Sequence, residues 1–299
     1  MDAAVVAVHS LLESSLPVPT VIHLLHTDGL SAEHLASLSS VVARHAFAEL
    51  QLHDLAPMLA LHAEELRRVS GTWSLAIWGR WFIPDLLDGV RGRVLYLDTD
   101  VLVVKDLGEL FATDLGAAVI GAVGEDNGKT GNFPAGERFY FNSGVLLMDL
   151  DGLRASDCYR RLVAFLAESG ELSCPDQDAL NALFGDRAVY LHARWNFNDA
   201  WVSRQLHFRL SDGYWRGRPA REVLESVADP GIIHYIGVHK PWRDGASRPE
   251  GARYLRAMRQ LAQPVPRRGR TAWLRDVFHF ICRRIAVRRL RKLMTKVKQ

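Results

Sequence analysis

Apolar and polar residues alternate along the chain with two different periods. Stretches in which apolar residues recur every three or four positions predict helices, and short continuous apolar runs between turn residues predict buried strands. Helices are predicted at residues 3–14, 31–45, 57–68, 73–87, 152–168 and 176–184, and strands at 18–25, 46–52, 93–97, 101–104, 117–123, 144–149, 187–191 and 231–236. This succession predicts an α/β protein whose sheet has helices on both faces.

Three of these segments carry more specific expectations. Ser31 precedes the second helix and is placed to cap it, with Glu33 in the first turn. The run at 93–97 is almost entirely apolar, which is typical of a parallel strand in the centre of a sheet. The chain opens on the helix at 3–14, whereas such a sheet usually opens on a strand. Either the sheet starts unconventionally or a first strand is missing.

Charge divides the chain into two parts. Its 299 residues are 48% apolar, which suffices for one large α/β domain with a small appendage and excludes global disorder. The net charge of +3 is the sum of −8 for residues 1–266, the body, and +11 for residues 267–299, the tail. The tail contains 12 Lys or Arg and a single acidic residue. We therefore expect two domains with different roles.

Cysteine content and hydropathy exclude several classes of protein. The chain has three cysteines, an odd number, and they are widely spaced: Cys158, Cys174 and Cys282. We therefore expect neither a disulfide framework nor a zinc knuckle, and we expect the protein to reside in a reducing compartment. The N-terminus lacks the basic segment of a signal peptide. No apolar stretch approaches 18 residues, so we expect no membrane span.

Two carboxylates, Asp98 and Asp100, stand two positions apart just after the strand predicted at 93–97. Ligands of open α/β sheets gather at the carboxyl ends of strands. Hard cations such as Mg²⁺ and Mn²⁺ prefer carboxylate oxygens and often share their coordination with substrate phosphates. A solvated turn would have the same D-x-D sequence, so both interpretations stay open.

A second motif runs from His234, at the end of a predicted strand, to Lys240. An imidazole here could join the two carboxylates on a metal, with Lys240 on a phosphate and Gly237 allowing close backbone approach. His239 is the weaker metal candidate, and a structural role for either histidine is the alternative.

Two further motifs are polar. Asp176 and Gln177 open a predicted helix, where Asp176 either caps the helix or belongs to a polar cluster directed at a sugar. Asn142 precedes the apolar run of a strand in the sequence F-N-S-G, which could also mark a tight turn.

The four motifs, in this order, resemble glycosyltransferase family 8. The resemblance covers about residues 5–245 and rests on D-x-D, F-N-x-G-V-L-L, P-D-Q-D-x-L-N and H-x-x-G-x-x-K-P-W. The family contains bacterial lipopolysaccharide galactosyl- and glucosyltransferases and glycogenin. The resemblance implies the GT-A fold, a mixed central sheet with helices on both faces. It also implies a UDP-glucose or UDP-galactose donor, Mn²⁺ (or Mg²⁺), a saccharide acceptor such as lipopolysaccharide, and retention at the anomeric carbon.

The resemblance also assigns roles to residues. Carried over by position, the metal ligands are Asp98, Asp100 and His234, and the donor contacts are Arg80, Thr99, Gly237 and Lys240 together with the two aspartates. Asn142, Asp176 and Gln177 would lie at the transferred sugar, where Gln177 supports the transition state by polar contact. Glu125 or Asp126 falls where the family has an acid near the donor or acceptor sugar, and the alignment leaves both open.

The chain departs from the family at its start. Residues 10–14, S-L-L-E-S, match a pattern that follows the family's first strand and its base-binding segment. The chain therefore resembles a member without that strand. For such a form we expect weaker nucleotide binding, lower stability and an apolar sheet edge that invites aggregation. A start site placed too far downstream and a truncated gene both explain the pattern.

The tail is predicted to be an amphipathic helix. Trp273, Val277, Ile281 and Ile285 form a stripe beside clustered arginines. Such a helix lies in the interface of an anionic membrane, which predicts a cytoplasmic protein held at the inner face of the cytoplasmic membrane. A docked C-terminal helix is the alternative. A nucleic-acid partner is not expected, because no aromatic-rich nucleic-acid module accompanies the arginines.

Two other functions remain open. A haloacid-dehalogenase-like phosphatase also uses D-x-D, but it has Thr or Val where this chain has Leu102, and it leaves the motif of His234 unexplained. A glycosyltransferase-like scaffold that has lost donor binding is the non-catalytic alternative.

Overall fold

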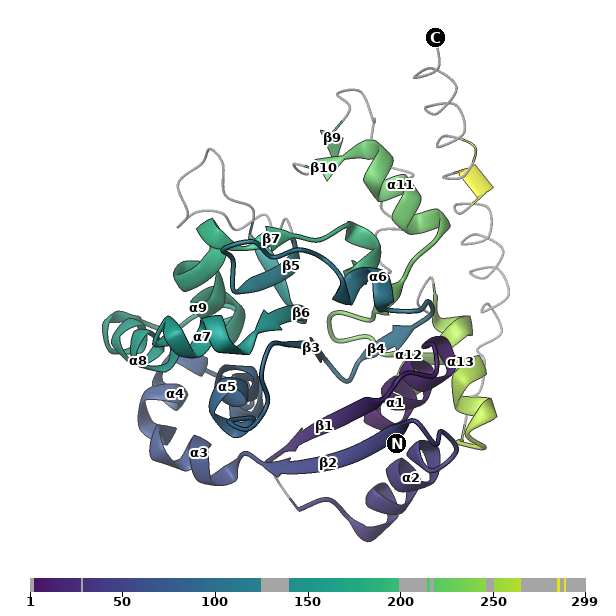
Figure 1. Cartoon of the computed structure of the whole chain (residues 1–299), viewed down its shortest axis with the longest axis horizontal. Coiled ribbons are helices and arrows are strands. Elements are labelled where there is room, and N and C mark those ends of the chain that lie inside the picture. Colours follow the sequence, from purple (N-terminus) through teal and green to yellow (C-terminus); the bar gives the residue numbers. More distant parts are fainter. Residues whose placement is uncertain are drawn as a thin grey trace.

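The computed structural model describes residues 3–27, 29–124, 140–198, 214–215, 218–245 and 250–264, together with 284, 285 and 288. The strands are β1 (Thr20–His26), β2 (Ala48–Asp54), β3 (Arg93–Leu97), β4 (Val101–Val103), β5 (Ile120–Gly124), β6 (Phe141–Asp149), β7 (Val189–Tyr190), β8 (Phe197–Asn198), β9 (Tyr214–Trp215), β10 (Arg218–Pro219) and β11 (Ile232–His234) (Figure 1).

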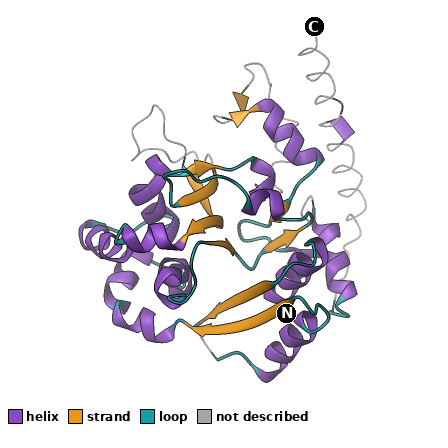
Figure 2. Cartoon of the chain, in the orientation of Figure 1, coloured by secondary structure: helices purple, strands orange, loops and turns teal. Residues whose placement is uncertain are grey.

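The α-helices are α1 (Ala3–Ser14), α2 (Ala32–Val42), α3 (Ala56–Leu61), α4 (Ala63–Ser70), α5 (Ile83–Leu86), α6 (Gly108–Phe111), α7 (Leu150–Ala155), α8 (Cys158–Glu168), α9 (Pro175–Phe184), α11 (Ala220–Ala228), α12 (Pro241–Asp244) and α13 (Gly251–Gln260). The 3₁₀ helices are η1 (Leu75–Phe82), η3 (Gly185–Arg187) and η4 (Ala193–Asn196). Helices lie on either side of the strands, which confirms the expected α/β architecture (Figure 2).

Strand pairing among the described residues is mixed. One sheet has the order β3-β6-β5-β7, in which β6 is antiparallel to both β3 and β5, and β7 is parallel to β5. A second has the order β4-β11-β8, with β11 antiparallel to β4 and parallel to β8. The prediction that 93–97 is a parallel central strand is wrong, because β3 pairs only with β6 in the described part and runs antiparallel to it.

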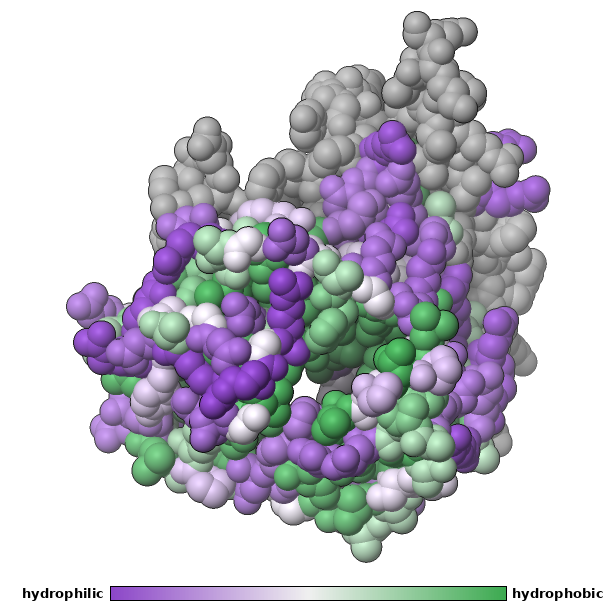
Figure 3. All heavy atoms as spheres, viewed as in Figure 1, coloured by the Kyte–Doolittle hydropathy of each residue, from purple (hydrophilic) through white to green (hydrophobic). Residues whose placement is uncertain are grey.

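The strands β1 and β2 form a separate parallel pair. In the described residues, neither of them is hydrogen-bonded to β3, whose five residues are all half-buried although the run is apolar. The space-filling view shows the molecule hollowed between β1 and the β3–β4 segment (Figure 3). The sheet is therefore interrupted at β3.

Helix α1 is buried on nearly all sides because it lies between two layers. Val5, Val8 and Leu12 pack in a core with Ile22 of β1 and with α2, while Val6 and Ala7 join the core of the β4–β11 sheet. The Ser10 hydroxyl accepts a hydrogen bond from the Val103 amide at 3.0 Å, which joins α1 to β4. A further core lies beneath η1, β6, α8 and α9.

Several predicted elements have different bounds. The Ser31 hydroxyl caps α2 by accepting from the His34 amide, as expected. The predicted helix at 57–68 is interrupted at His62, and that at 152–168 is interrupted at Asp157, whose φ of 53° is left-handed. The F-N-S-G sequence lies within β6, so the tight-turn interpretation is wrong. In the described part, no helix is both long and apolar enough to cross a bilayer.

Candidate active site

The D-x-D segment is the point at which the chain passes from one sheet to the other. Asp98 follows β3, and its amide donates to the Gly144 carbonyl of β6 at 2.8 Å. Asp100 precedes β4, and its carbonyl accepts from the Tyr235 amide at 3.0 Å. Each aspartate is therefore anchored to a different sheet, which excludes the freely solvated turn.

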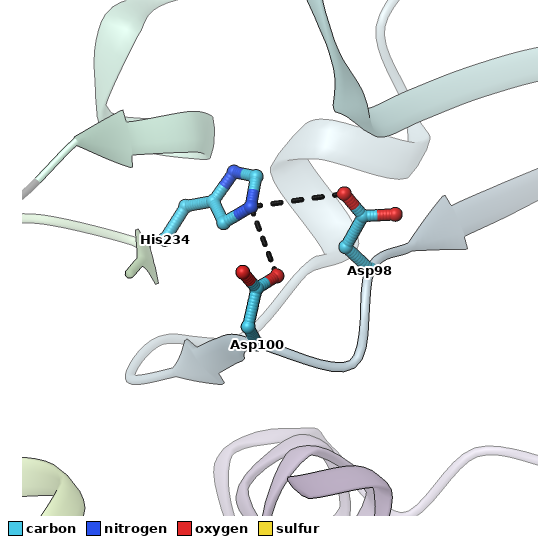
Figure 4. A group of neighbouring side chains, drawn as sticks. All are labelled: Asp98, Asp100 and His234. Carbon is cyan, nitrogen blue, oxygen red and sulfur yellow. Dashed lines mark hydrogen bonds and ion pairs between the residues drawn. The ribbon is translucent and has the colours of Figure 1, made fainter. Parts of the chain in front are cut away.

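These two carboxylates meet His234, the last residue of β11 (Figure 4). His234 Nε2 lies 3.0 Å from Asp100 Oδ1 and 3.7 Å from Asp98 Oδ2. Among the described residues, one ligand atom from each of the three lies within 4.8 Å of the others. The prediction from the motifs that these side chains come together is confirmed.

The other oxygen of Asp98 is held by the protein. Oδ1 accepts from Tyr96 Oη at 2.6 Å and from Arg80 Nη2 at 3.0 Å. The buried Arg80 also contacts Asp176 Oδ2 at 3.1 Å. Burial opposes the charge of Arg80, but Asp176 and Asp98 outweigh it and raise the pKa of Arg80 above its ordinary value. Asp98 therefore presents Oδ2 to the cluster in a fixed orientation.

The other oxygen of Asp100 is bound by Lys240. Lys240 Nζ donates to Asp100 Oδ2 and to the Tyr235 carbonyl. Burial alone would raise the pKa of Asp100, but His234 and Lys240 more than offset it and hold that pKa well below its usual range. Asp100 is therefore ionised throughout the physiological range.

Polar side chains of β6 and α9 extend the site. Gln177 Oε1 accepts from the Ser143 amide at 2.9 Å and from Asn142 Nδ2 at 3.0 Å. Asp176 Oδ2 accepts from Ser143 Oγ at 2.9 Å, in addition to its contact with Arg80. Asp176 makes no side-chain cap on α9, so the capping interpretation is wrong. Asp176 belongs instead to a polar cluster with Arg80 and Ser143. That this cluster is directed at a sugar stays a prediction.

The absence of a side chain at Gly144 leaves room for the cluster. A Cβ atom at this position would lie 2.7 Å from Asp98 Oδ2 and closer still to the imidazole of His234. Any larger residue would displace one of them. This close approach is a reason for glycine at this position of the mostly buried strand β6.

The donor set fits a hard divalent cation. Two carboxylate oxygens and one imidazole nitrogen converge from three positions, and both carboxylates are fixed by hydrogen bonds from the surrounding protein. Oxygen ligands with one imidazole suit Mg²⁺ or Mn²⁺ better than a softer metal. Asp98, Asp100 and His234 are therefore the residues that would hold it.

The remaining predicted residues lie around this centre or outside the described part. Thr99 is exposed on the turn between the aspartates. Gly237 has a φ of 93°, which favours glycine. His239 is exposed and contacts Asp244, away from the cluster. Glu125 and Asp126 lie outside the described residues, as does most of the predicted amphipathic tail.

Three residues of the site were not predicted. Tyr96, in the strand predicted at 93–97, donates to Asp98. Ser143, in the F-N-S-G sequence, donates to Asp176. Asn196, at the end of η4, accepts from His234 Nδ1 at 2.8 Å and stands in no motif that was recognised. Its only signal was a polar residue between two buried aromatics, Trp195 and Phe197.

Comparison with solved structures defines the class of fold. The galactosyltransferase LgtC, solved in complex with donor and acceptor sugar analogues, matches with a TM-score of 0.69. The match covers 88% of this chain and 93% of that one, at 25% sequence identity. The protein has the GT-A fold of glycosyltransferases, as expected.

Comparison with known sequences defines the family. The model of "Glycosyl transferase family 8" matches residues 1–246, and the chain belongs to this family. General stress protein A of Bacillus subtilis is 30% identical over 191 residues, which are 61% of this chain. The chain spans 64% of the length of that relative. A lipopolysaccharide 1,2-glucosyltransferase of Escherichia coli is 27% identical over 255 residues, which cover 82% of this chain and 70% of that protein.

Proposed function

We propose that the protein transfers a hexose, glucose or galactose, from a UDP-sugar to a saccharide acceptor with retention of configuration. The observation that carries this proposal is that two groups of polar side chains lie next to each other where the chain passes from one sheet to the other. Asp98, Asp100 and His234 form a site suited to a divalent cation. The amides of Asn142 and Gln177 adjoin it on β6 and α9.

The leaving group is a diphosphate, on which negative charge develops as the bond to the sugar breaks. When bound, Mn²⁺ or Mg²⁺ supplies Lewis-acid stabilisation of that charge. Lys240 forms an ion pair with Asp100. When the donor is bound, the ammonium group of Lys240 would move from this carboxylate to a phosphate oxygen and stabilise the developing charge. The left-handed Gly237 lets the backbone approach the same diphosphate.

Retention requires either a carboxylate nucleophile or attack by the acceptor on the face that the leaving group departs from. Gln177 is the nearest predicted group to the anomeric carbon, and its oxygen already accepts two hydrogen bonds. An amide oxygen so engaged is a poor nucleophile. We therefore assign same-face attack, with Gln177 supporting the transition state by polar contact.

A pocket of about 360 Å³ supports a site for the nucleoside. It lies at the carboxyl end of β1 and is lined by Thr27, Arg67, Ser74, Leu75 and Ala76 among others. Its volume is within the range of small-molecule sites, which is roughly 300–1,000 Å³. Leu75 and Ala76 of η1 line this pocket, and Arg80, later in the same helix, contacts Asp98. A contact of Arg80 with the nucleotide stays a prediction.

The acceptor class is taken from the relatives. The E. coli relative is named for lipopolysaccharide, and we propose lipopolysaccharide or another cell-surface glycan as acceptor. The basic tail would hold the enzyme at the inner face of the cytoplasmic membrane, where a lipid-linked acceptor is presented.

Hydrolysis of a panel of UDP-sugars with Mn²⁺ and with Mg²⁺ tests the proposal. We expect turnover with UDP-glucose or UDP-galactose, lost in Asp98→Asn and Asp100→Asn and kept in Asp114→Asn, an exposed acid outside the site. Release of phosphate from simple monoesters without turnover of any UDP-sugar would instead identify the phosphatase alternative.

The role of Gln177 has a separate test. Gln177→Ala should lower kcat at saturating donor by about 10- to 100-fold, the value of one hydrogen bond to a charged centre. The exposed Gln51→Ala is the control. An unchanged kcat in Gln177→Ala would show that this side chain does not act in the transition state.

The interrupted sheet supports a second candidate, a scaffold without donor turnover. In the described residues the β1–β2 pair forms no ladder with β3, and the pocket proposed for the nucleoside begins at Thr27, directly after β1. Folded protein that binds no UDP in a calorimeter and turns over no UDP-sugar would favour this candidate.

A further inference from the structure

A chain of side-chain hydrogen bonds connects the proposed sugar site with the proposed metal site. It runs from Gln177 through Asn142 and Asn196 to His234, which belong to α9, β6, η4 and β11. Asn142 Nδ2 donates to Gln177 Oε1 at 3.0 Å, and Asn196 Nδ2 donates to Asn142 Oδ1 at 2.8 Å. Asn196 Oδ1 lies 2.8 Å from His234 Nδ1. Gln177, Asn196 and His234 are buried.

Two backbone amides set the direction of this chain. A backbone N–H can only donate, whereas the oxygen and nitrogen of an amide side chain can exchange places by a flip. The Ser143 amide donates to Gln177 at 2.9 Å, so the oxygen of Gln177 faces β6. The Gly144 amide donates to Asn142 at 2.9 Å, so the oxygen of Asn142 faces Gly144 and its nitrogen faces Gln177.

The orientation of Asn142 in turn determines the orientation of Asn196 and the position of a hydrogen on His234. Because the Asn142 oxygen also faces Asn196, the contacting atom of Asn196 must be its nitrogen. The oxygen of Asn196 consequently faces His234, and Nδ1 of the imidazole must carry a hydrogen to donate to it. The other ring nitrogen, Nε2, faces Asp98 and Asp100, and in the metal-free protein it can donate a hydrogen to Asp100. With a hydrogen on Nδ1, replacing the hydrogen on Nε2 by a cation leaves the Nε2 lone pair for that cation.

We propose that Asn196 is a positioning residue that binds the Nδ1–H group of His234 and so directs Nε2 at a divalent cation. The metal part of this inference rests on the proposed function. The hydrogen on Nδ1 does not, because it follows from the two backbone amides and the side-chain contacts that connect them with His234. Without Asn196, the imidazole is free to rotate or to place its hydrogen on Nε2, where it blocks coordination.

Nitrogen-15 NMR of the metal-free protein tests the hydrogen on Nδ1 directly. The signals of the His234 ring are assigned by their loss in His234→Gln. We expect a hydrogen on Nδ1 in the wild type and faster exchange of that hydrogen with solvent in Asn196→Leu. A wild-type spectrum in which Nδ1 carries no hydrogen would overturn the proposal, whether or not any variant folds.

Titration with Mn²⁺ alone, followed by the electron paramagnetic resonance of the free ion, tests the consequence. Asn196→Leu should lower Mn²⁺ affinity by roughly 10- to 100-fold, as loss of an outer-shell partner usually does. Asn196→Asp keeps an oxygen acceptor for Nδ1–H, although it loses the donor to Asn142, and should bind Mn²⁺ more tightly than Asn196→Leu. Ser226→Ala removes a buried hydroxyl on α11 and is the control for loss of a buried polar contact.

The two proposals fail in different ways. Wild-type protein that carries a hydrogen on Nδ1 of His234 but binds no Mn²⁺ would overturn the metal site and leave the positioning of His234 supported. Folded Asn196→Leu that binds Mn²⁺ as tightly as the wild type would overturn the role of Asn196 and leave the metal site intact.

Discussion

Arg80 is the buried cation that allows two carboxylates to lie in the interior next to each other. Its guanidinium contacts Asp98, Asp176 and the Ser143 carbonyl, and it stacks over the Tyr96 ring with 4.6 Å between the guanidinium carbon and the ring centroid. Burial raises the pKa of Asp176, and Arg80 counteracts this rise. Arg80 thus keeps the local charge balanced in the metal-free protein.

Replacing Arg80 should therefore destabilise the fold strongly. Arg80→Met leaves two carboxylates without their partner, which costs about 3–5 kcal/mol in comparable buried ion pairs. Urea denaturation measures the loss in free energy of unfolding. The control is Arg160→Gln, because Arg160 is 81% exposed and pairs with Asp157 at the surface. Equal losses in the two variants would contradict the structural role of Arg80.

Cys158 is a buried thiol that should resist modification. Burial, followed by the nearby Asp85 and Asp157, raises its pKa to about 11 from an ordinary 9.0. At pH 8 the folded chain then holds about 100-fold less thiolate than the unfolded chain. With Cys174 and Cys282 replaced by serine, labelling by a disulfide reagent should be slower in buffer than in urea by at least that factor. Equal rates would contradict the burial.

The same shift has a consequence for stability. Because the folded pKa is raised, folding favours the protonated thiol. The contribution of Cys158 to the free energy of unfolding is fully present below pH 9 and is lost as the pH rises toward 11. The advantage of wild type over Cys158→Ala in free energy of unfolding should shrink across that interval.

Some residues of the site could be predicted from sequence and others could not. Asp98, Asp100, His234 and Lys240 stand at fixed spacings beside apolar strands, and the structure brings all four together. Asn196 acts through contacts with residues 54 and 38 positions away. No local pattern reports such contacts, because they arise only when η4 packs against β6 and β11.

At the scale of elements, β6 is the strand to which the most functional contacts attach. It pairs with β3 and β5, and its first residues provide Asn142, Ser143 and Gly144 to the site. Periodicity located this strand but placed its start at 144 instead of Phe141. The polar residues at its beginning are typical of a turn in sequence. In the structure they belong to the strand and bind Gln177 and Asp176.

Substitution of Gly144 should separate the metal ligands without removing any of them. In Gly144→Ala, the new methyl group would overlap the His234 imidazole and the Asp98 carboxylate. We expect Mn²⁺ affinity to fall by about 10-fold or more, measured by calorimetry. Gly89→Ala, where a Cβ meets nothing within 4 Å, is the matched control. Unchanged affinity in Gly144→Ala would contradict the triad geometry.

Other differences between predicted and observed elements have the same origin. The apolar run of β3 cannot reveal whether its partner is parallel, because both kinds of neighbour bury the same side chains. The break at Asp157 depends on a left-handed backbone that an acidic residue adopts only occasionally. Sequence periodicity reports the burial of a segment, while pairing and breaks depend on its neighbours.

At the scale of the whole molecule, net charge differs sharply between two parts of the chain. The body that carries the proposed metal ligands has a net charge of −8, whereas residues 267–299 carry +11. Each basic residue near an anionic membrane contributes about 1 kcal/mol of attraction. If the tail lies on an anionic membrane as proposed, its attraction would be large enough to hold the negatively charged body there.

Removal of residues 267–299 should release the protein from anionic vesicles while leaving hydrolysis of the UDP-sugar unchanged. Co-sedimentation with vesicles containing phosphatidylglycerol measures binding, and neutral vesicles are the control. Binding of the full chain should also weaken as salt is added. If the shortened protein sediments with anionic vesicles as the full chain does, the tail is not the membrane element.

The interruption between β1 and β3 also shapes how the molecule opens. Helix α2 and the β1–β2 pair have their own core with one side of α1, and the described strands of this group form no ladder with β3. A group that shares no strand pairing with the rest of the described sheet can detach without unfolding it. Exchange of backbone amide hydrogens should then proceed through two separate openings. The amides of β1 and β2 would exchange through the less costly one, and those of β3, β5 and β6 only when the whole body unfolds.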